Sequence, residues 1–236
     1  MIKLNTDSKV LVLTGAGISA ESGIKTFRDS GGLWENHRVE DVASVEGFLR
    51  NPGLVWDFYK KRYQDSMNSL PNAAHQALVK LEEFIGKNFT LVTQNVDGLH
   101  TKAGSKHVLE MHGSLQRCYC TKCQAKYQMQ DIPNEQPIPT CIKCKAMLRP
   151  DIVWFGEIPY YLAEIEIAVK NCEYLIVIGT SGFVYPAAGF VMSAKLLGSK
   201  TIAINLAKPD NLSFIDEFYQ GKSGELLPEL VQQWIA

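Results

Sequence analysis

Four cysteines stand in two closely spaced pairs, an arrangement that is typical of a zinc site. Cys120 and Cys123 form one C-x2-C pair, Cys141 and Cys144 form the other, and seventeen residues separate the pairs. Each C-x2-C turn places two thiolates on one side of a tight knuckle, so two knuckles complete a tetrahedral set of sulfur ligands. Because protein ligands fill all four positions, the pattern predicts one structural Zn2+ per chain rather than a catalytic ion, which keeps a position open for water.

Two other interpretations of the cysteines remain open. Both pairs could be redox-active, although neither lies in a thioredoxin-like sequence. Cys118 is close enough to the first pair to compete as a zinc ligand. Cys172 adjoins the apolar run that begins at Tyr174, so we expect it to be a core residue.

A glycine-rich segment, residues 15–20 (GAGISA), follows the first apolar run of the chain. It matches the G-x-G-x-x-A pattern, in which glycines let the backbone approach a pyrophosphate and free amides at a helix N-terminus face its charge. We expect it to open a helical turn and bind phosphate groups, with a plain tight turn as the alternative. A dehydrogenase would continue into a second strand ending in an acidic ribose-binding residue about 20 positions later. Residues 25–34 are instead polar and contain glycines, which favours a loop over the bound group and argues against hydride transfer.

Polar side chains also gather after a later strand-like run, in residues 93–100 (TQNVDGLH). Ligands of open α/β sheets bind beyond the carboxyl ends of the strands. Side chains such as Gln94, Asn95 and Asp97 suit ribose hydroxyls and a carboxamide. The alternative is a capped turn, in which Asn95 or Asp97 closes the next helix.

His112 ends an apolar stretch, residues 108–114, just before the cysteine-rich segment. A lone histidine is usually structural, but clefts form at the junction of two domains, where His112 is expected to lie. It is therefore the candidate general base. The other four histidines have no comparable support.

Alternating strands and helices are expected to position these groups. Runs typical of buried parallel strands occupy residues 9–14, 89–93, 174–178 and 200–205, and helical patterns occupy residues 73–84 and 187–197. Strands that alternate with helices predict an α/β fold with a doubly wound, Rossmann-like parallel sheet.

Two segments interrupt this alternation. Residues 29–70 contain no strand-like run, and Pro52 follows a potential capping asparagine, so we expect a helical insertion. Residues 117–150 are rich in Cys, Lys, Gln and Pro and hold five of the six cysteines. The expected division is a main domain of residues 1–116 and 151–236 and a zinc-binding module of residues 117–150.

Composition narrows the class of protein. The chain has 236 residues, 46% hydrophobic and 21% charged, which fits one globular domain with a small appended unit and not a collagenous or disordered chain. A formal net charge of -1 provides no field toward nucleic acid or an anionic membrane, so we expect neither as a partner. The apolar run at residues 10–13 is too short for a signal peptide or a membrane span, and we expect a cytoplasmic protein.

Together these motifs resemble those of the sirtuins, NAD-dependent protein-lysine deacylases, over nearly the whole chain. The matching segments, in the family's order and approximate spacing, are residues 15–19 with 26–28, 93–97, 112–113, the two cysteine pairs, 154–157 and 179–181. The resemblance implies a Rossmann-like domain that binds NAD as a co-substrate, beside a module with structural Zn2+. It also implies an enzyme that transfers the acyl group of a protein lysine to ADP-ribose, giving nicotinamide, 2′-O-acyl-ADP-ribose and free lysine.

The resemblance assigns roles to individual residues. It makes His112 the base that deprotonates a ribose hydroxyl, gives Asn95 and Asp97 to nicotinamide and Gln94 to the ribose, and lets Phe27 shield the reacting carbon. The implied NAD-binding residues are Gly15, Ala16, Gly17, Ile18, Ser19, Ala20, Thr26, Phe27, Arg28, Trp34, Gln94, Asn95, Val96, Asp97, Gly179, Thr180, Ser181, Asn205, Leu206, Ala207 and Ser223.

By the same resemblance, the acylated lysine of a protein substrate enters a cleft between the main domain and the zinc module. Its backbone is expected to pair as an added strand between residues 155–157 and the loop near Tyr185, a mode that tolerates many sequences. The implied substrate-binding residues are Tyr59, Arg62, Val153, Phe155, Gly156, Glu157 and Tyr185. The sequence leaves the oligomeric state open, with a monomer as the default expectation.

Tyr59 and Arg62 carry a signature for the acyl group. They are three residues apart in the helical insertion and share one helix face, so both can point into one pocket. A phenol and a guanidinium suit a negatively charged acyl tail, whose carboxylate the guanidinium can bind with two hydrogen bonds. With residues 179–188, the pair resembles the bacterial sirtuin class that removes succinyl and malonyl groups, in addition to acetyl. The alternative is a solvated basic helix face at Lys60, Lys61 and Arg62.

Two other functions stay open. The chain could bind NAD or ADP-ribose as a regulator without turnover, or it could transfer mono-ADP-ribose to protein. The presence of His112, Asn95 and Asp97 favours the deacylase, because a protein that only binds has no need of a base. Lys25 departs from the family pattern, in which many relatives carry proline or arginine, but it replaces no catalytic group.

Overall fold

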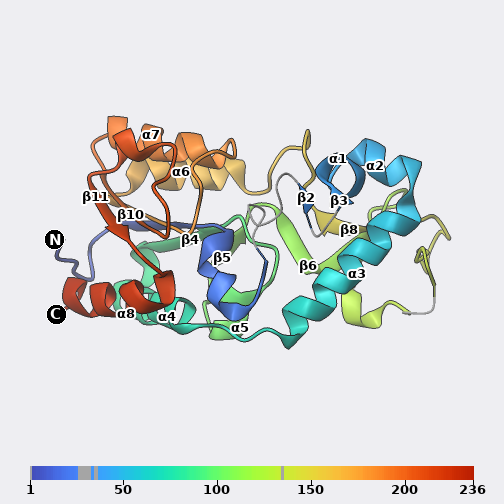
Figure 1. Ribbon diagram of the computed structural model, residues 1–236, viewed down its shortest axis with the longest axis horizontal. Helices are drawn as coiled ribbons and strands as arrows, with labels where there is room; N and C mark the ends of the chain where they lie inside the picture. The colour runs from blue at the N-terminus through green and yellow to red at the C-terminus, as the bar shows by residue number, and fades with distance from the viewer. Residues whose placement is uncertain (1, 26–32, 35–36, 134–135) are drawn as a thin grey trace.

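The computed structural model describes residues 2–25, 33–34, 37–133 and 136–236, with residues 33–34 as backbone only. Two units lie side by side along the long axis of the molecule (Figure 1). One is a six-stranded sheet with helices on both faces, and the other combines a three-stranded sheet with the helices of residues 39–68. The predicted α/β fold with a smaller second unit is confirmed.

All six strands of the larger sheet are parallel. In spatial order they are β11 (Glu217–Gln220), β10 (Lys200–Asn205), β9 (Tyr174–Ile178), β1 (Val10–Thr14), β4 (Phe89–Thr93) and β5 (Val108–Glu110). The register places Thr14 beside both Thr93 and Ile178, so the three central strands end at one level. The loops that follow these strands therefore meet at a single edge of the sheet, where a doubly wound fold binds its ligands.

Helices cover both faces of this sheet, which is why its central strands are continuously apolar. Val10 and Val12 of β1 face one core, whereas Leu11 and Leu13 face another. The first core contains helices α4 (Ala73–Ile85) and α8 (Ser223–Trp234), and the second contains α6 (Leu162–Asn171) and α7 (Ala187–Leu196) (Figure 1).

The four predicted strands are confirmed to within one residue, since only β1 begins later, at Val10 instead of Lys9. β5 and β11 lack this sequence signal. They lie at the two edges of the sheet, have three and four residues, and are mostly half-buried. An edge strand is less covered than a central one, so its side chains need not form a continuous apolar run.

The helical insertion is present, although it also contains strands. Its helices are α1 (Val39–Val42), α2 (Val45–Arg50) and α3 (Pro52–Asn68). α3 begins at Pro52, and Asn51 caps it by accepting a hydrogen bond from Leu54 N at 3.1 Å. The expectation that residues 29–70 contain no strand is wrong, because β2 (Leu33–Trp34) pairs antiparallel with β3 (His37–Arg38). Strands of two residues are too short to show a periodic pattern.

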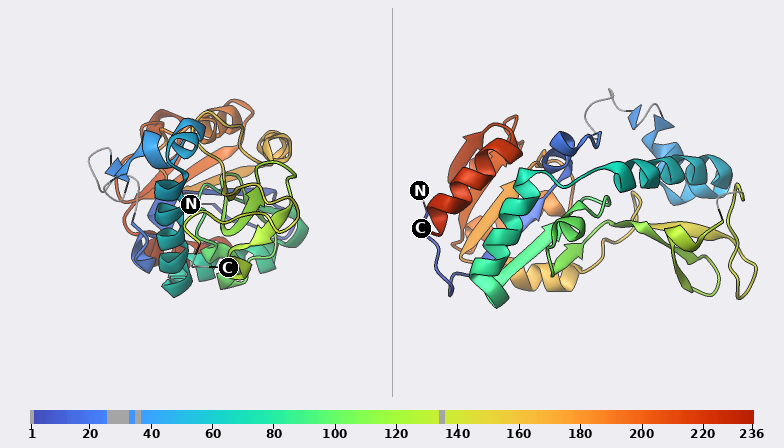
Figure 2. Two further views of the ribbon diagram at one scale, coloured as in Figure 1. Left: turned by 90° about the vertical axis from the view of Figure 1, so that its right-hand side faces the viewer. Right: turned by 90° about the horizontal axis from the view of Figure 1, so that it is seen from below.

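The smaller sheet is antiparallel and packs against α3 (Figure 2). Its strands, in the order β7-β6-β8, are β7 (Lys126–Gln128), β6 (Gly113–Cys120) and β8 (Leu148–Ile152). Trp56 of α3 donates from Nε1 to Leu148 O at 3.0 Å. The helical insertion and the cysteine module thus share one core. The smaller sheet begins with β6 at Gly113 and ends with β8 at Ile152. It therefore extends a few residues beyond the zinc-binding module of residues 117–150 that composition predicts.

The remaining elements are short. They are α5 (Leu99–Ala103) and the 3-10 turns η1 (Ala16–Ile18), η2 (Ala20–Ser22), η3 (Gly86–Asn88), η4 (Met129–Asp131) and η5 (Leu212–Phe214). The two ends of the chain lie close together, with Leu4 N donating to Trp234 O at 2.7 Å (Figure 1). Within the described residues, none of the helices combines the length and the apolar character that a membrane crossing requires.

Candidate functional site

Two glycine loops pack backbone to backbone at the carboxyl edge of the sheet. Gly17 follows β1, Gly179 follows β9, and Gly17 N donates to Gly179 O at 2.8 Å. A Cβ at Gly17 would lie 2.7 Å from Gly179 Cα, and a Cβ at Gly179 would lie 2.3 Å from Ile18 N. Gly179 also has a φ of +64°, so only glycine fits here without displacement. The chain after Gly15 continues as η1 and η2, which confirms the expected helical turn.

Asn95 joins the glycine loop to the end of β4. The residue is 8% exposed, and its Nδ2 donates to Gly15 O and to Ser19 Oγ, both at 3.1 Å. Its backbone N donates to Thr93 Oγ1 at 3.0 Å. The amide nitrogen is therefore engaged within the chain, and Oδ1 is the side-chain atom that can meet a ligand.

Asp97 is buried at the start of α5, where Oδ1 accepts a hydrogen bond from Leu99 N at 2.9 Å. This bond closes a turn just before α5, but the N-cap of α5 is Gly98 and the helix has no side-chain cap. Burial raises the pKa of the Asp97 carboxyl, while hydrogen bonds from Leu99 and Ser19 and the positive charge of Arg62 oppose the rise. A buried carboxyl with a perturbed pKa beside a cation is a common feature of functional sites.

His112 lies between β5 and β6, where its Nδ1 is 3.0 Å from Gln94 O. A carbonyl oxygen only accepts, so Nδ1 carries the proton and Nε2 keeps a lone pair. Burial lowers the pKa of His112, and the Gln94 carbonyl partly offsets this by supporting the protonated ring. At neutral pH the side chain is therefore an uncharged imidazole whose Nε2 can accept a proton.

The backbone around His112 is held firmly. Val153 N donates to His112 O at 2.9 Å. Gly113 has a φ of +84°, and a Cβ there would lie 2.0 Å from Asp151 O. The chain can therefore turn from β5 into β6 directly after His112 only because residue 113 is glycine.

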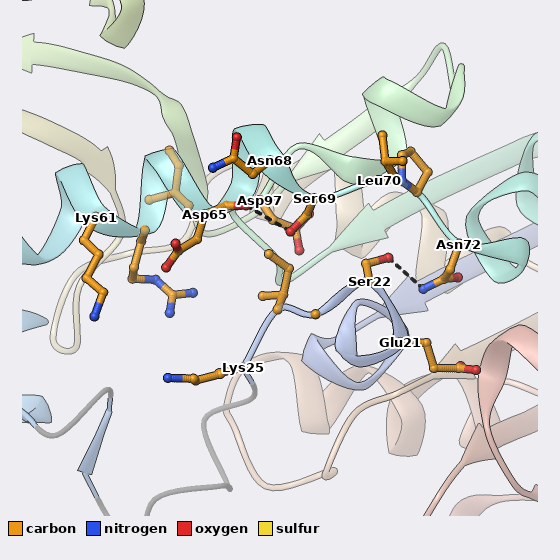
Figure 3. Close-up of a pocket in the computed structure, with 15 residues that line it drawn as sticks. Glu21, Ser22, Lys25, Lys61, Asp65, Asn68, Ser69, Leu70, Asn72 and Asp97 are labelled. Atoms are coloured by element: carbon orange, nitrogen blue, oxygen red, sulfur yellow. Dashed lines mark hydrogen bonds between the residues drawn. The ribbon is translucent and has the colours of Figure 1, made fainter.

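A cavity of about 720 Å³ lies between the segment that follows the glycine motif and α3 (Figure 3). It is lined by residues 21–25, by residues 61, 62, 65 and 68–72, and by Asp97 and Leu115. Figure 3 shows Lys61 and Asp65 on α3 facing the segment that carries Lys25. Two expected site residues, Arg62 and Asp97, thus meet at the same cavity as the segment that follows the glycine motif.

Sequence reasoning missed Asn72, which connects this cavity to the fold. Asn72 caps α4 through Ala74 N, and its Nδ2 donates to Ile18 O at 2.7 Å and to Ser22 Oγ at 3.0 Å (Figure 3). An asparagine before a helical pattern predicts a cap, but no local signal predicts partners 54 and 50 residues away. Glu21 was missed for the same reason, since its Oε2 accepts from Gly224 N at 2.7 Å across 203 residues.

The residues expected on the adenosine side lie on the loops after β9 and β10 and at the start of α8. Asn205 donates from Nδ2 to Thr180 O at 2.8 Å. Ser223 is buried, and its Oγ lies 3.5 Å from Glu21 Oε2. Leu206 is 67% exposed. The expected residues Thr26, Phe27 and Arg28 lie outside the described residues, as does the side chain of Trp34.

Tyr59 and Arg62 lie on α3 but in different surroundings. Arg62 lines the cavity, whereas Tyr59 is 1% exposed and belongs to the core of the smaller unit. Tyr59 Oη accepts a hydrogen bond from Trp154 Nε1 at 3.0 Å. Burial raises the pKa of Tyr59, and the Trp154 hydrogen bond and the charge of Arg62 oppose the rise. Arg62 is therefore near both the Tyr59 hydroxyl and the Asp97 carboxyl.

Glu157, expected to contact substrate, is engaged within the chain. Its two oxygens accept from the two terminal nitrogens of Arg149 at 2.8 and 2.9 Å, and Oε2 also accepts from Trp154 N at 2.9 Å. Burial favours a higher pKa for Glu157, but Arg149 and the Trp154 amide hold it below its usual range. The Glu157 carboxylate thus holds the loop after β8 in place through its hydrogen bonds to Arg149 and to Trp154 N.

The other residues expected to bind the substrate backbone lie on the loops after β8 and β9. Phe155 is 56% and Tyr185 75% exposed. Phe155 N donates to Ala43 O and Glu157 N to Trp154 O, both at 3.0 Å. A substrate strand at residues 155–157 would therefore have to pair through other backbone groups.

The four paired cysteines converge on one point. Their Sγ atoms lie within 4.8 Å of one another, with 3.4 Å between Cys120 and Cys144 and 3.6 Å between Cys123 and Cys141. A tetrahedral ion with Zn–S bonds of about 2.3 Å requires sulfur separations of about 3.8 Å, so the set fits structural Zn2+. Cys118 lies outside this group, and burial raises the pKa of its thiol to about 12. The single four-sulfur cluster favours the zinc site over two separate redox pairs.

Relatives of known name resemble this chain over nearly its whole length. Residues 15–186 match the Sir2 family. A protein of Bdellovibrio bacteriovorus and one of Pasteurella multocida, both named NAD-dependent protein deacylase, are 50% and 48% identical to it over 229 residues. The alignments cover 96% of this chain and 96% and 98% of those proteins.

Solved structures show the same fold. A mutant Sir2 homologue in complex with ADP-ribose superimposes with a TM-score of 0.91 at 41% identity, covering 97% of this chain and 92% of that one. A Sir2 homologue with NAD gives 0.89 at 41%, covering 97% and 90%. A Sir2 mutant with a p53 peptide and NAD gives 0.84 at 31%, covering 95% and 92%. On the family match, the sequence identity and the shared fold, this chain belongs to the Sir2 family.

Proposed function

We propose that this chain is an NAD-dependent protein-lysine deacylase that removes succinyl and malonyl groups, and also acetyl groups. The observation that carries the proposal is the shared cavity, because residues 21–25, which directly follow the glycine motif, and Arg62 of α3 line one space together with Asp97. A co-substrate held by the glycine loop and an acidic acyl tail held by Arg62 would meet there. The name shared by the relatives and the NAD complex of a structural neighbour support the proposal.

His112 supplies the base in this proposal. Its Nε2 accepts the proton of a ribose hydroxyl, and burial keeps the imidazole uncharged and ready to do so near neutral pH. The imidazolium that results donates from Nδ1 to Gln94 O, which stabilises the new charge. The fixed tautomer and the bonded backbone hold Nε2 in one place through the step.

The remaining residues hold the reacting groups in place. When bound, NAD supplies the electrophilic ribose carbon that receives the acyl oxygen as nicotinamide departs. In this proposal Asn95 Oδ1 and the Asp97 carboxyl recognise the carboxamide, and the backbones at Gly15 and Gly179 approach the phosphates. The deprotonated ribose hydroxyl attacks the acyl carbon and one water molecule completes the transfer, so the products are nicotinamide, 2′-O-acyl-ADP-ribose and free lysine. The zinc site takes no part in the chemistry, because its four positions belong to cysteines.

The acyl preference is tested with Arg62→Met and one peptide carrying succinyl-, malonyl- or acetyl-lysine, assayed with and without NAD. Removing one partner of a buried charge pair costs about 2–5 kcal/mol, so we expect the kcat/KM for succinyl-lysine to fall by about 30- to 3,000-fold. Acetyl-lysine has no carboxylate, so its kcat/KM should fall far less. Mass spectrometry of the products measures both rates.

Lys61→Met is the matched control. Lys61 precedes Arg62 on α3, lines the same cavity and is exposed, so its loss removes equal charge without the buried contact. We expect it to change the succinyl-to-acetyl ratio by less than about 3-fold, since exposed pairs contribute little. Equal losses on succinyl- and acetyl-lysine in Arg62→Met would contradict the proposed acyl specificity.

A further inference from the structure

Polar groups hold Trp154, a residue 2% exposed, on three sides. The Arg149 guanidinium lies over its ring, with Cζ 3.6 Å from the centroid. Its backbone N donates to Glu157 Oε2 at 2.9 Å, and its Nε1 donates to Tyr59 Oη at 3.0 Å. Arg149 is 7% exposed and is itself bound to Glu157 by two hydrogen bonds. Because cation–π contacts and paired charged hydrogen bonds are strong when desolvated, the indole has little freedom to turn.

The bond to Tyr59 decides where the phenol proton points. An indole N–H can only donate, so Tyr59 Oη accepts from Trp154 and must direct its own proton elsewhere. Among the hydrogen bonds formed between described residues, none accepts that proton. Tyr59 therefore presents its hydroxyl as a donor.

Arg62 makes this orientation relevant to substrate. It lies one helical turn beyond Tyr59 on α3, acts electrostatically on the Tyr59 hydroxyl and lines the cavity. A donor hydroxyl beside a guanidinium forms a site of donors only, which matches a carboxylate because a carboxylate only accepts. Without the indole N–H of Trp154, the Tyr59 hydroxyl could turn its lone pair toward Arg62. The acyl site would then lose the Tyr59 hydroxyl as a hydrogen-bond donor.

We propose that Trp154 is a specificity-determining positioning residue, which keeps the Tyr59 hydroxyl a donor for acyl groups that end in a carboxylate. Arg149 and Glu157 hold the indole in the position that this requires. The inference rests on the deacylase function proposed above. It also gives Glu157 a role, because this carboxylate acts on the acyl site through Trp154 and not by contact with substrate.

The test is Trp154→Phe, which removes the N–H and keeps an aromatic ring under Arg149. The measured quantity is the ratio of kcat/KM for succinyl-lysine to kcat/KM for acetyl-lysine in one peptide at saturating NAD. We expect this ratio to fall by about 2- to 12-fold, the effect of one neutral hydrogen bond. An unchanged ratio would overturn the proposal.

Trp56→Phe is the matched control, because Trp56 is a second buried indole in the same core and donates to a backbone carbonyl, Leu148 O. Its loss should lower the melting temperature but not the succinyl-to-acetyl ratio. An equal fall of the ratio in both variants would show a general effect of core loosening and would overturn the role of Trp154.

A double variant tests whether Trp154 acts through Tyr59. Tyr59→Phe should lower the ratio by itself, and adding Trp154→Phe should lower it no further, because no hydroxyl is left to orient. Additive losses would overturn the proposed route. If Trp154→Phe does not fold, Glu157→Gln is the second variant, because it weakens the hydrogen bonds between residue 157 and Arg149. It should lower the succinyl-to-acetyl ratio by a smaller factor. An unchanged ratio in Glu157→Gln would count against the proposal.

The two proposals fail differently. A wild-type chain without a preference for succinyl-lysine, or an Arg62→Met variant with equal losses, overturns the acyl specificity and the role of Trp154 with it. A preference that Arg62→Met abolishes and Trp154→Phe preserves overturns only the role of Trp154.

Discussion

Alanine in place of Gly179 tests whether the close contact of the two glycine loops is required for NAD binding. The new methyl group would lie 2.3 Å from Ile18 N and 2.6 Å from the carbonyl carbon of Gly17. Ordinary contacts of a Cβ begin at 3.4 Å, so the loops after β1 and β9 must separate by about 1 Å. That movement displaces the backbone that is expected to approach the phosphates.

Two effects of different size follow from Gly179→Ala. A φ of +64° costs an L-residue about 1–2 kcal/mol, which lowers the melting temperature of a chain of this length by about 2–8 °C. A misplacement of about 1 Å in a site can reduce the rate by about 100-fold. We therefore expect a folded variant whose kcat/KM for NAD is about 100-fold lower than that of the wild type.

Gly198→Ala separates these two effects. Gly198 has a φ of +94°, and a Cβ there would meet no heavy atom within 4 Å. This variant should show only the fall in melting temperature that the positive φ causes, and a kcat/KM for NAD within about 3-fold of the wild type. The assay varies NAD at a fixed concentration of one acylated peptide, with a thermal melt of each variant. Equal kcat/KM values for NAD in Gly179→Ala and Gly198→Ala would refute the requirement for close loop contact.

Three further predictions concern the base, the metal and a buried histidine. His112→Ala should lower the deacylation rate by about 10²–10⁴-fold while NAD binding and the melting temperature are kept, and a rate above a tenth of the wild-type value would contradict its role as base. Because burial lowers the pKa of His112, the acidic limb of the kcat/KM profile should lie below pH 6.5. Metal analysis should find one Zn2+ per chain in the wild type and in Cys118→Ala, and chelation should lower the melting temperature and the activity; a zinc-free chain with an unchanged melt would exclude the structural role. Burial lowers the pKa of His75 to about 4. Between pH 6.5 and 4 the unfolded chain therefore binds a proton that the folded chain does not. The free energy of unfolding should then fall as the pH falls, by up to about 1.4 kcal/mol per pH unit. His75→Gln retains an acceptor for Asn72 N and should lose less stability than the wild type between pH 7 and 5, as thermal melts at the two values would show.

The central strands and the cysteine set show what local patterns can predict. β4, β9 and β10 have the bounds expected from their apolar runs, because a strand covered on both faces must be apolar throughout. The spacing of the paired cysteines predicts the four-sulfur cluster by itself, since a tetrahedral ion requires two knuckles of this kind. The cap at Asn51 before Pro52 is equally local, spanning three residues.

Long-range contacts could not be predicted, because a sequence pattern contains only periodicity and the spacing of residues that are close in the chain. The bond from Trp154 to Tyr59 spans 95 residues, and the bond from Gly224 to Glu21 spans 203. In neither pair does the local sequence around one residue indicate the other residue as its hydrogen-bond partner. The segments meet only because the helical insertion packs on the smaller sheet and the glycine loop lies against the start of α8.

Glu157 illustrates the limit for site residues. The resemblance at residues 154–157 implies a contact with substrate, which stays a prediction, and the structure adds that the two oxygens of Glu157 accept hydrogen bonds from Arg149 and the Trp154 amide. The sequence by itself determined a parallel sheet, a glycine motif and a four-cysteine set, because each of these patterns depends on residue types and spacing within single segments of the chain. Only the tertiary structure decided which donors each carboxylate meets, which nitrogen of His112 is free and which side chains share the cavity, because these depend on how distant segments pack.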